Sequence, residues 1–137
     1  MTKQNQPNKS GKKYEIEVRE ALEEIKYSYR RTKECDFELI TAEGKVGLEA
    51  KGQQTDGTTD EKLMYGVFKY ADKYKKLIFL LHQNFKVRDE KILHSMYEAA
   101  KIYGCKLTIL FGTNELKKYL NELPMSNGIF AFCDEEK

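Results

Sequence analysis

The chain has 137 residues and a formal net charge of +2, from 24 Lys and Arg against 22 Asp and Glu. This length predicts one domain with a sizeable core, and the near-neutral charge excludes a protein that binds nucleic acid through a global polycationic surface. Three scattered cysteines without a Cys-x-x-Cys pair indicate reduced thiols and a cytoplasmic protein. Neither a signal peptide nor an apolar run long enough to cross a membrane is recognisable.

The amino-terminal part divides into a polar arm and a helix. Residues 1–9 are polar and predict a disordered arm, so a single folded domain is expected over residues 10–137. The domain begins with a helix that runs to about Lys26, because apolar residues recur at helical spacing. Glu15 and Glu17 lie on opposite borders of this apolar stripe, and helix geometry alone does not separate them as site residues. The stripe consists of Tyr14, Val18, Ala21, Leu22 and Ile25.

Three short strands are predicted next. Residues 27–32 alternate in polarity and are rich in β-forming residues. Residues 37–48 contain two short apolar stretches around a turn-like segment at 42–45, which predicts a hairpin. In the first of these strands, Arg30 and Arg31 either face a phosphate or are edge-strand charges that oppose aggregation.

The two ends of the hairpin carry charged residues that indicate metal chemistry. Asp36 precedes the first hairpin strand, whereas Glu49 and Lys51 end the second and share one face, being two residues apart. Because a hairpin brings its ends together, Asp36 is expected beside Glu49. Two adjacent carboxylates resist ionisation, and a hard divalent cation with oxygen ligands relieves their repulsion. Such a cation polarises a phosphate and activates water, while Lys51 is suited to orient the nucleophile or stabilise developing charge.

The segment after the hairpin leads into a second helix. Gln53 continues the alternation of the charged residues and is expected to contact a water or a phosphate on their face. Thr58 and Glu61 have the spacing of a capping box, which opens a helix that runs to about Tyr74. A helix start suits a phosphate, because its backbone amides are unsatisfied. Lys62 opposes the helix dipole, so it either grips phosphate or is an incidental charge.

The remaining chain alternates strands and helices. Residues 77–81 and 107–111 are continuous apolar runs, which predict strands buried on both faces. Helices are predicted at residues 89–103 and 113–123. The tail, residues 126–137, is a final strand, a packing flap or a surface that pairs with a second copy. The whole order predicts an α/β fold with a central mixed sheet flanked by helices.

The charged residues of the hairpin also resemble a known motif. Asp36, the segment Leu48–Lys51 and Gln53 are similar to the motif of the PD-(D/E)xK nuclease superfamily, which includes type II restriction endonucleases and Holliday-junction resolvases. The resemblance covers roughly residues 11–82. It departs at Cys35, where the family frequently has Pro.

Two further segments carry the resemblance. Gly57–Lys62 is similar to a segment that follows the motif in some restriction-like members, and Gly11–Glu15 looks like the first helix of Holliday-junction resolvases. The second similarity implies Glu15, in preference to Glu17, as the acidic residue of that helix. The first six predicted elements, αβββαβ, have the core order of the restriction-endonuclease-like fold that the resemblance implies.

This resemblance implies a Mg²⁺-dependent DNA endonuclease of restriction type, in which Mn²⁺ substitutes for Mg²⁺. Asp36 and Glu49 would hold the metal, together with the backbone carbonyl of Ala50. Lys51 would position or activate the attacking water, and Glu15 would assist the metal site. The implied substrate contacts are Gln53, Thr58 and Lys62.

Several other functions are compatible with the same sequence. Cutting both strands of a duplex with one small domain requires two active sites, so a homodimer is expected. A Holliday-junction resolvase, or another structure-specific nuclease of the same fold, is the first alternative. A non-catalytic nucleic-acid-binding domain and an unrelated α/β interaction domain are the others. Only the nucleases predict metal binding that Asp36→Ala abolishes.

Overall fold

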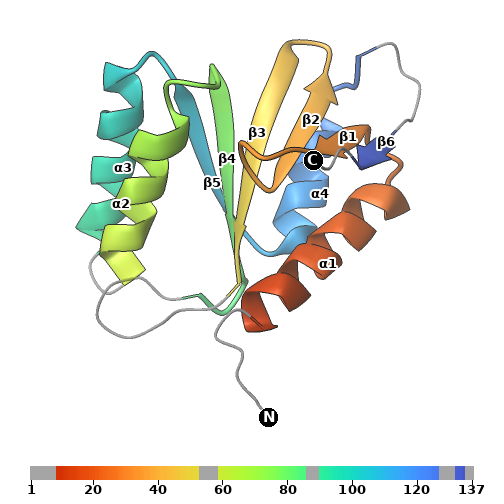
Figure 1. Ribbon diagram of the computed structural model, residues 1–137, viewed down its shortest axis with the longest axis horizontal. Helices are drawn as coiled ribbons and strands as arrows, with labels where there is room; N and C mark the ends of the chain where they lie inside the picture. The colour runs from red at the N-terminus through yellow and green to blue at the C-terminus, as the bar shows by residue number, and fades with distance from the viewer. Residues whose placement is uncertain (1–8, 53–58, 86–89, 127–131, 135–137) are drawn as a thin grey trace.

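One mixed sheet lies between two layers of helices (Figure 1). The structure is a computed structural model that describes residues 9–52, 59–85, 90–126 and 132–134. Within this part of the chain, none of the helices has the length and apolar character that a membrane-spanning helix requires. The elements in chain order are α1 (Lys9–Glu24), β1 (Tyr29–Arg31), β2 (Phe37–Thr41), β3 (Gly44–Lys51), α2 (Thr59–Tyr70), β4 (Lys76–Leu81), α3 (Lys91–Ile102), β5 (Lys106–Phe111), α4 (Thr113–Asn121) and β6 (Phe132–Asp134).

The strands are ordered β5-β4-β3-β2-β1-β6 across the sheet. β1, β2 and β3 form an antiparallel meander, β4 and β5 continue parallel to β3, and β6 pairs in parallel with β1. This confirms the α/β class, the αβββαβ core order and the mixed sheet. The tail therefore contributes a strand. Because β6 covers β1, the interpretation of Arg30 and Arg31 as edge-strand charges is wrong.

Each face of the sheet has its own apolar core. On one face, Tyr14, Val18 and Leu22 of α1 pack with residues of α4 against the β2–β3 hairpin. On the other face, α2 and α3 pack against β4 and β5. In β3 the odd-numbered residues from Lys45 to Lys51 face α2, because strand side chains alternate. Gly47 is required there, since a Cβ would lie 2.8 Å from Cδ2 of Tyr74.

The predicted burial and boundaries differ from the structure in a few places. β4 is buried as predicted. In β5, by contrast, Leu107 is buried and the other residues are partly exposed or exposed, because β5 is an edge strand. α1 ends at Glu24, two residues before the predicted end at Lys26, which adopts a left-handed φ of 56°. α2 ends at Tyr70 and is followed by a turn, four residues before the predicted end at Tyr74.

The sheet topology brings the charged residues to one edge. β3 ends at Lys51, and β2, which runs antiparallel to it, begins directly after Asp36. In Figure 1 the end of β3 lies low in the view, beside the amino-terminal end of α1. The carboxyl ends of β4 and β5 share this edge because both strands are parallel to β3. Any site built from the hairpin ends is therefore located where α1 approaches the sheet.

Candidate active site

Asp36 and Glu49 are neighbours across the ends of the hairpin. The register pairs Phe37 with Leu48, so the next step along both strands brings Asp36 to Glu49. The backbone N–H of Asp36 donates to Glu49 Oε1 at 3.2 Å, and the N–H of Ala50 donates to Asp36 Oδ2 at 2.8 Å. The structure therefore brings together the two carboxylates that the sequence predicted to be adjacent.

Burial and mutual repulsion disfavour the charged forms of both carboxylates. Glu49 is only 6% exposed, and burial followed by the charge of Asp36 raises the pKa of Glu49 to about 7. Burial also raises the pKa of Asp36, although the hydrogen bond from Ala50 and the charges of Lys51 and Arg31 act in the opposite direction. Two carboxyl groups in this condition gain stability from a nearby cation.

Lys51 and Tyr70 contact Glu49 from two different elements. Lys51 Nζ lies 3.5 Å from Glu49 Oε2, and its side chain is 34% exposed, so the ammonium is also accessible from solvent. The hydroxyl of Tyr70, from α2, donates to the same oxygen at 3.4 Å. Burial and the charge of Glu49 raise the pKa of Tyr70, which keeps the phenol protonated as a donor. Tyr70 was not among the predicted site residues, although its position in the helical spacing of α2 was an available signal.

Arg31 connects α1 to Asp36. Its Nε donates to the backbone carbonyl of Asp36 at 2.9 Å, and its Nη2 lies 3.3 Å from Glu15 Oε1. A side-chain hydrogen bond with Glu15 is also among the influences that lower the pKa of Asp36. Glu17, in contrast, is exposed. Of the two carboxylates that helix geometry left open, Glu15 is the one that lies beside Asp36.

The other predicted site residues are placed less closely or lie outside the described residues. Gln53 and Thr58 lie outside them. Lys62 is exposed in the first turn of α2, and none of the contacts among the described residues joins it to the carboxylates. The side chain of Ala50 packs into the core on the α1 side, so its part in the site is made by the backbone.

The carboxylate pair fits a cation that keeps much of its own hydration. Within the described ranges, no group of three or more His, Cys, Asp or Glu side chains is already gathered to hold a metal ion. Mg²⁺ does not need such a cage, because it usually retains several waters and is bound by one or two carboxylates with substrate phosphates. Asp36 and Glu49, with their raised pKa values, supply two oxygen donors whose repulsion such an ion would relieve.

Comparison with known proteins identifies the family of this site. Residues 2–103 match the family model of a PD-(D/E)XK nuclease superfamily domain. No curated protein and no solved structure matches the chain. The matched range contains α1, the meander, α2 and β4, and every site residue described above lies within it. The chain therefore belongs to the PD-(D/E)XK nuclease superfamily.

Proposed function

We propose that this protein is a Mg²⁺-dependent endodeoxyribonuclease that hydrolyses phosphodiester bonds in duplex DNA with restriction-type specificity. The observation that carries the proposal is the juxtaposition of Asp36, Glu49 and Lys51 at one edge of the sheet. Two buried carboxylates that favour a cation, next to an accessible ammonium, suit hydrolysis of a phosphodiester better than they suit a structural role.

Asp36 and Glu49 are the proposed metal ligands, with the backbone carbonyl of Ala50 as a further ligand. When bound, Mg²⁺ polarises the phosphate and lowers the pKa of a coordinated water, and Mn²⁺ substitutes for it. The protein holds Asp36 for this task through the N–H of Ala50, which donates to Oδ2. Tyr70 holds Glu49 through its hydroxyl, so both carboxylates are oriented by groups from rigid elements.

Lys51 is the proposed group that positions the attacking water and stabilises negative charge in the transition state. Its ammonium lies beside Glu49 yet remains partly exposed, so it is in contact with the metal ligands and accessible to substrate. Glu15 assists from α1 through its contact with Arg31. The proposed substrate contacts are Gln53, Thr58 and Lys62.

The assembly and location follow from the proposed reaction and the thiols. Because one small domain has one site, cleavage of both strands requires a second copy, so we propose a homodimer. Cys35 and Cys105 are free and buried, which fits a reducing compartment, and we propose the cytoplasm.

Incubation of the protein with supercoiled plasmid and with a four-way junction, in Mg²⁺ or chelator, tests the proposal. Wild type should give discrete plasmid fragments in Mg²⁺ only, and Lys51→Ala should give none. Lys45→Ala is the matched control, because Lys45 has the same charge and lies on the same face of β3 at its exposed far end. It should cut as wild type does.

Each other outcome points to a different function. Paired nicks confined to the junction would replace restriction-type cleavage by resolvase activity. Binding of both substrates without cleavage, equal in wild type and Lys51→Ala, would leave a non-catalytic nucleic-acid-binding domain. Absence of both Mg²⁺ binding and DNA binding would leave an interaction domain.

A further inference from the structure

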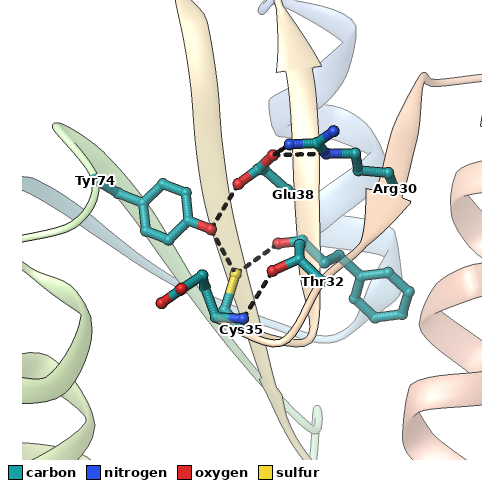
Figure 2. A network of polar contacts seen from close by, with 7 residues as sticks. Arg30, Thr32, Cys35, Glu38 and Tyr74 are labelled. Atoms are coloured by element: carbon teal, nitrogen blue, oxygen red, sulfur yellow. Dashed lines mark hydrogen bonds and ion pairs between the residues drawn. The ribbon is translucent and has the colours of Figure 1, made fainter. Parts of the chain in front are cut away.

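Two consecutive arginines on β1 have different surroundings because their side chains leave opposite faces of the sheet. Nε and Nη2 of Arg30 each lie 2.9 Å from Glu38 Oε1, and the Glu38 side chain is only 5% exposed. Tyr74 donates its hydroxyl to Oε2 of Glu38 at 2.8 Å, and the thiol of Cys35 donates to the Tyr74 oxygen at 3.4 Å (Figure 2). Arg30 therefore neutralises a buried carboxylate within the fold.

Arg31 is held as firmly but has hydrogen-bonding capacity left. Its guanidinium contacts the carbonyl of Asp36 and the carboxylate of Glu15, and its Cζ lies 4.8 Å from the ring centroid of Phe37. A guanidinium has five N–H donors, and these two hydrogen bonds use two of them. In the part of the chain that the structure describes, the other three have no protein partner. The side chain is 31% exposed, so these donors are accessible to a ligand.

A depression in the surface begins at this guanidinium. It has a volume of about 220 Å³ and is lined by Glu15, Ile16, Arg19 and Arg31. Arg19 lies one helical turn after Glu15, so α1 brings a second guanidinium to the same depression. The residues that line the depression therefore include two guanidiniums and one carboxylate.

We propose that Arg31, assisted by Arg19, binds a backbone phosphate of the nucleic acid next to the phosphodiester bond that is cut. The proposal rests on the proposed nuclease function and adds to it a phosphate contact on the α1 side of the site. A planar fork of N–H donors matches two oxygens of a phosphate, and here the fork is already fixed by three contacts. Because Arg31 bonds to Asp36 itself, a phosphate on its remaining donors lies beside the proposed metal ligands.

Salt dependence of DNA binding separates this role from a purely structural one. If Arg31 only linked α1 to Asp36, its loss would change the stability of the protein alone. If Arg31 also contacts a phosphate, its loss would in addition reduce the number of counterions released when DNA binds. The slope of log K against log salt concentration is negative, and loss of one contact makes it less negative by about 0.9. Binding of a fluorescent duplex is therefore measured by anisotropy, in chelator, over a range of salt concentrations.

The variants are chosen so that charge, geometry and fold are distinguished. Arg31→Gln should make the slope less negative by about one and weaken binding about tenfold at low salt. Arg31→Lys should keep the slope and weaken binding less, because the charge remains and the fork is lost. Arg19→Gln leaves the contact between Arg31 and Asp36 intact and should also make the slope less negative. Lys101→Gln on α3, whose side chain is 76% exposed, is the control for net charge and should bind as wild type.

Thermal unfolding of each variant identifies any loss of fold. If Arg31→Gln and Arg19→Gln are folded and keep the wild-type slope, the phosphate assignment is wrong, whatever their affinity, and the nuclease proposal is unaffected. If wild type itself fails to bind duplex DNA at low salt, the phosphate site fails, whereas the nuclease proposal is decided separately by the cleavage assay in Mg²⁺.

Discussion

Glu49→Gln should make the metal-free protein more stable at alkaline pH. Burial, and then the charge of Asp36, raises the pKa of Glu49 from 4.5 to about 7. A carboxyl group with a raised pKa in the folded state contributes stability that is complete below about pH 4.5 and is lost as the pH rises through about 7. The difference between the two pKa values is equivalent to about 3 kcal/mol of folding free energy.

Denaturant unfolding with chelator, at pH 5 and pH 8, measures this effect. Between these pH values, wild type should lose about 2–3 kcal/mol more than Glu49→Gln, because a neutral amide has no proton to lose. At pH 5 the two proteins should be nearly equally stable, since the protonated carboxyl and the amide are similar. A smaller pH dependence should remain in Glu49→Gln, because burial also raises the pKa of Asp36. Glu98→Gln, at an exposed position on α3, is the control and should follow wild type.

Mg²⁺ at pH 8 completes the test. It should stabilise wild type, because the ion binds the ionised carboxylates of the folded state, and stabilise Glu49→Gln much less. An unchanged pH dependence in Glu49→Gln would show that Glu49 does not hold its proton as argued. Equal stabilisation of both proteins by Mg²⁺ would remove Glu49 from the proposed ligands.

Three further predictions concern the surrounding fold. Gly47→Ala should destabilise the protein by about 1–3 kcal/mol in denaturant unfolding, because the new methyl group meets the ring of Tyr74; no change would mean that the ring moves freely. Arg30→Gln should lower stability by about 2 kcal/mol at pH 8, since it leaves Glu38 buried without its cation, and the 41% exposure of Arg30 keeps the loss below that of a fully buried pair; unchanged stability in denaturant unfolding would mean that Glu38 does not depend on this cation. Cys35 should resist iodoacetamide in the folded protein, because burial raises the pKa of its thiol to about 11, and should react once denatured; rapid native labelling in mass spectrometry would contradict its burial.

The hairpin and its charged ends were predictable because local rules determine them. A turn at residues 42–45 sets the register of the two strands, and the register brings Asp36 to Glu49. The period of two puts Glu49 and Lys51 on one face, where the structure shows them in contact. Helical spacing likewise predicted the apolar stripe of α1, and Tyr14, Val18 and Leu22 are buried. Each of these inferences needs only the geometry of one or two adjacent elements.

Contacts between distant elements were beyond local rules. Whether Arg30 or Arg31 faces the site depends on how β1 pairs with β2, and the sequence left both open. That Tyr70 donates to Glu49 depends on the docking of α2 on β3, which periodicity does not specify. The pairing of β6 with β1 joins segments about a hundred residues apart, so no local pattern indicated it.

The charge balance of the site is compatible both with folding and with the proposed binding of a cation. Lys51 and Arg31 flank the carboxylate pair, and both lower the pKa of Asp36. Burial nevertheless outweighs them, because the pKa values of Asp36 and Glu49 remain raised. If Lys51 and Arg31 neutralised the two carboxylates completely, the site would have little affinity for a divalent ion. If they did not neutralise them at all, the repulsion between the carboxylates would oppose folding before the ion binds. Partial compensation satisfies both requirements, and it places the two flanking cations where a substrate phosphate would meet them.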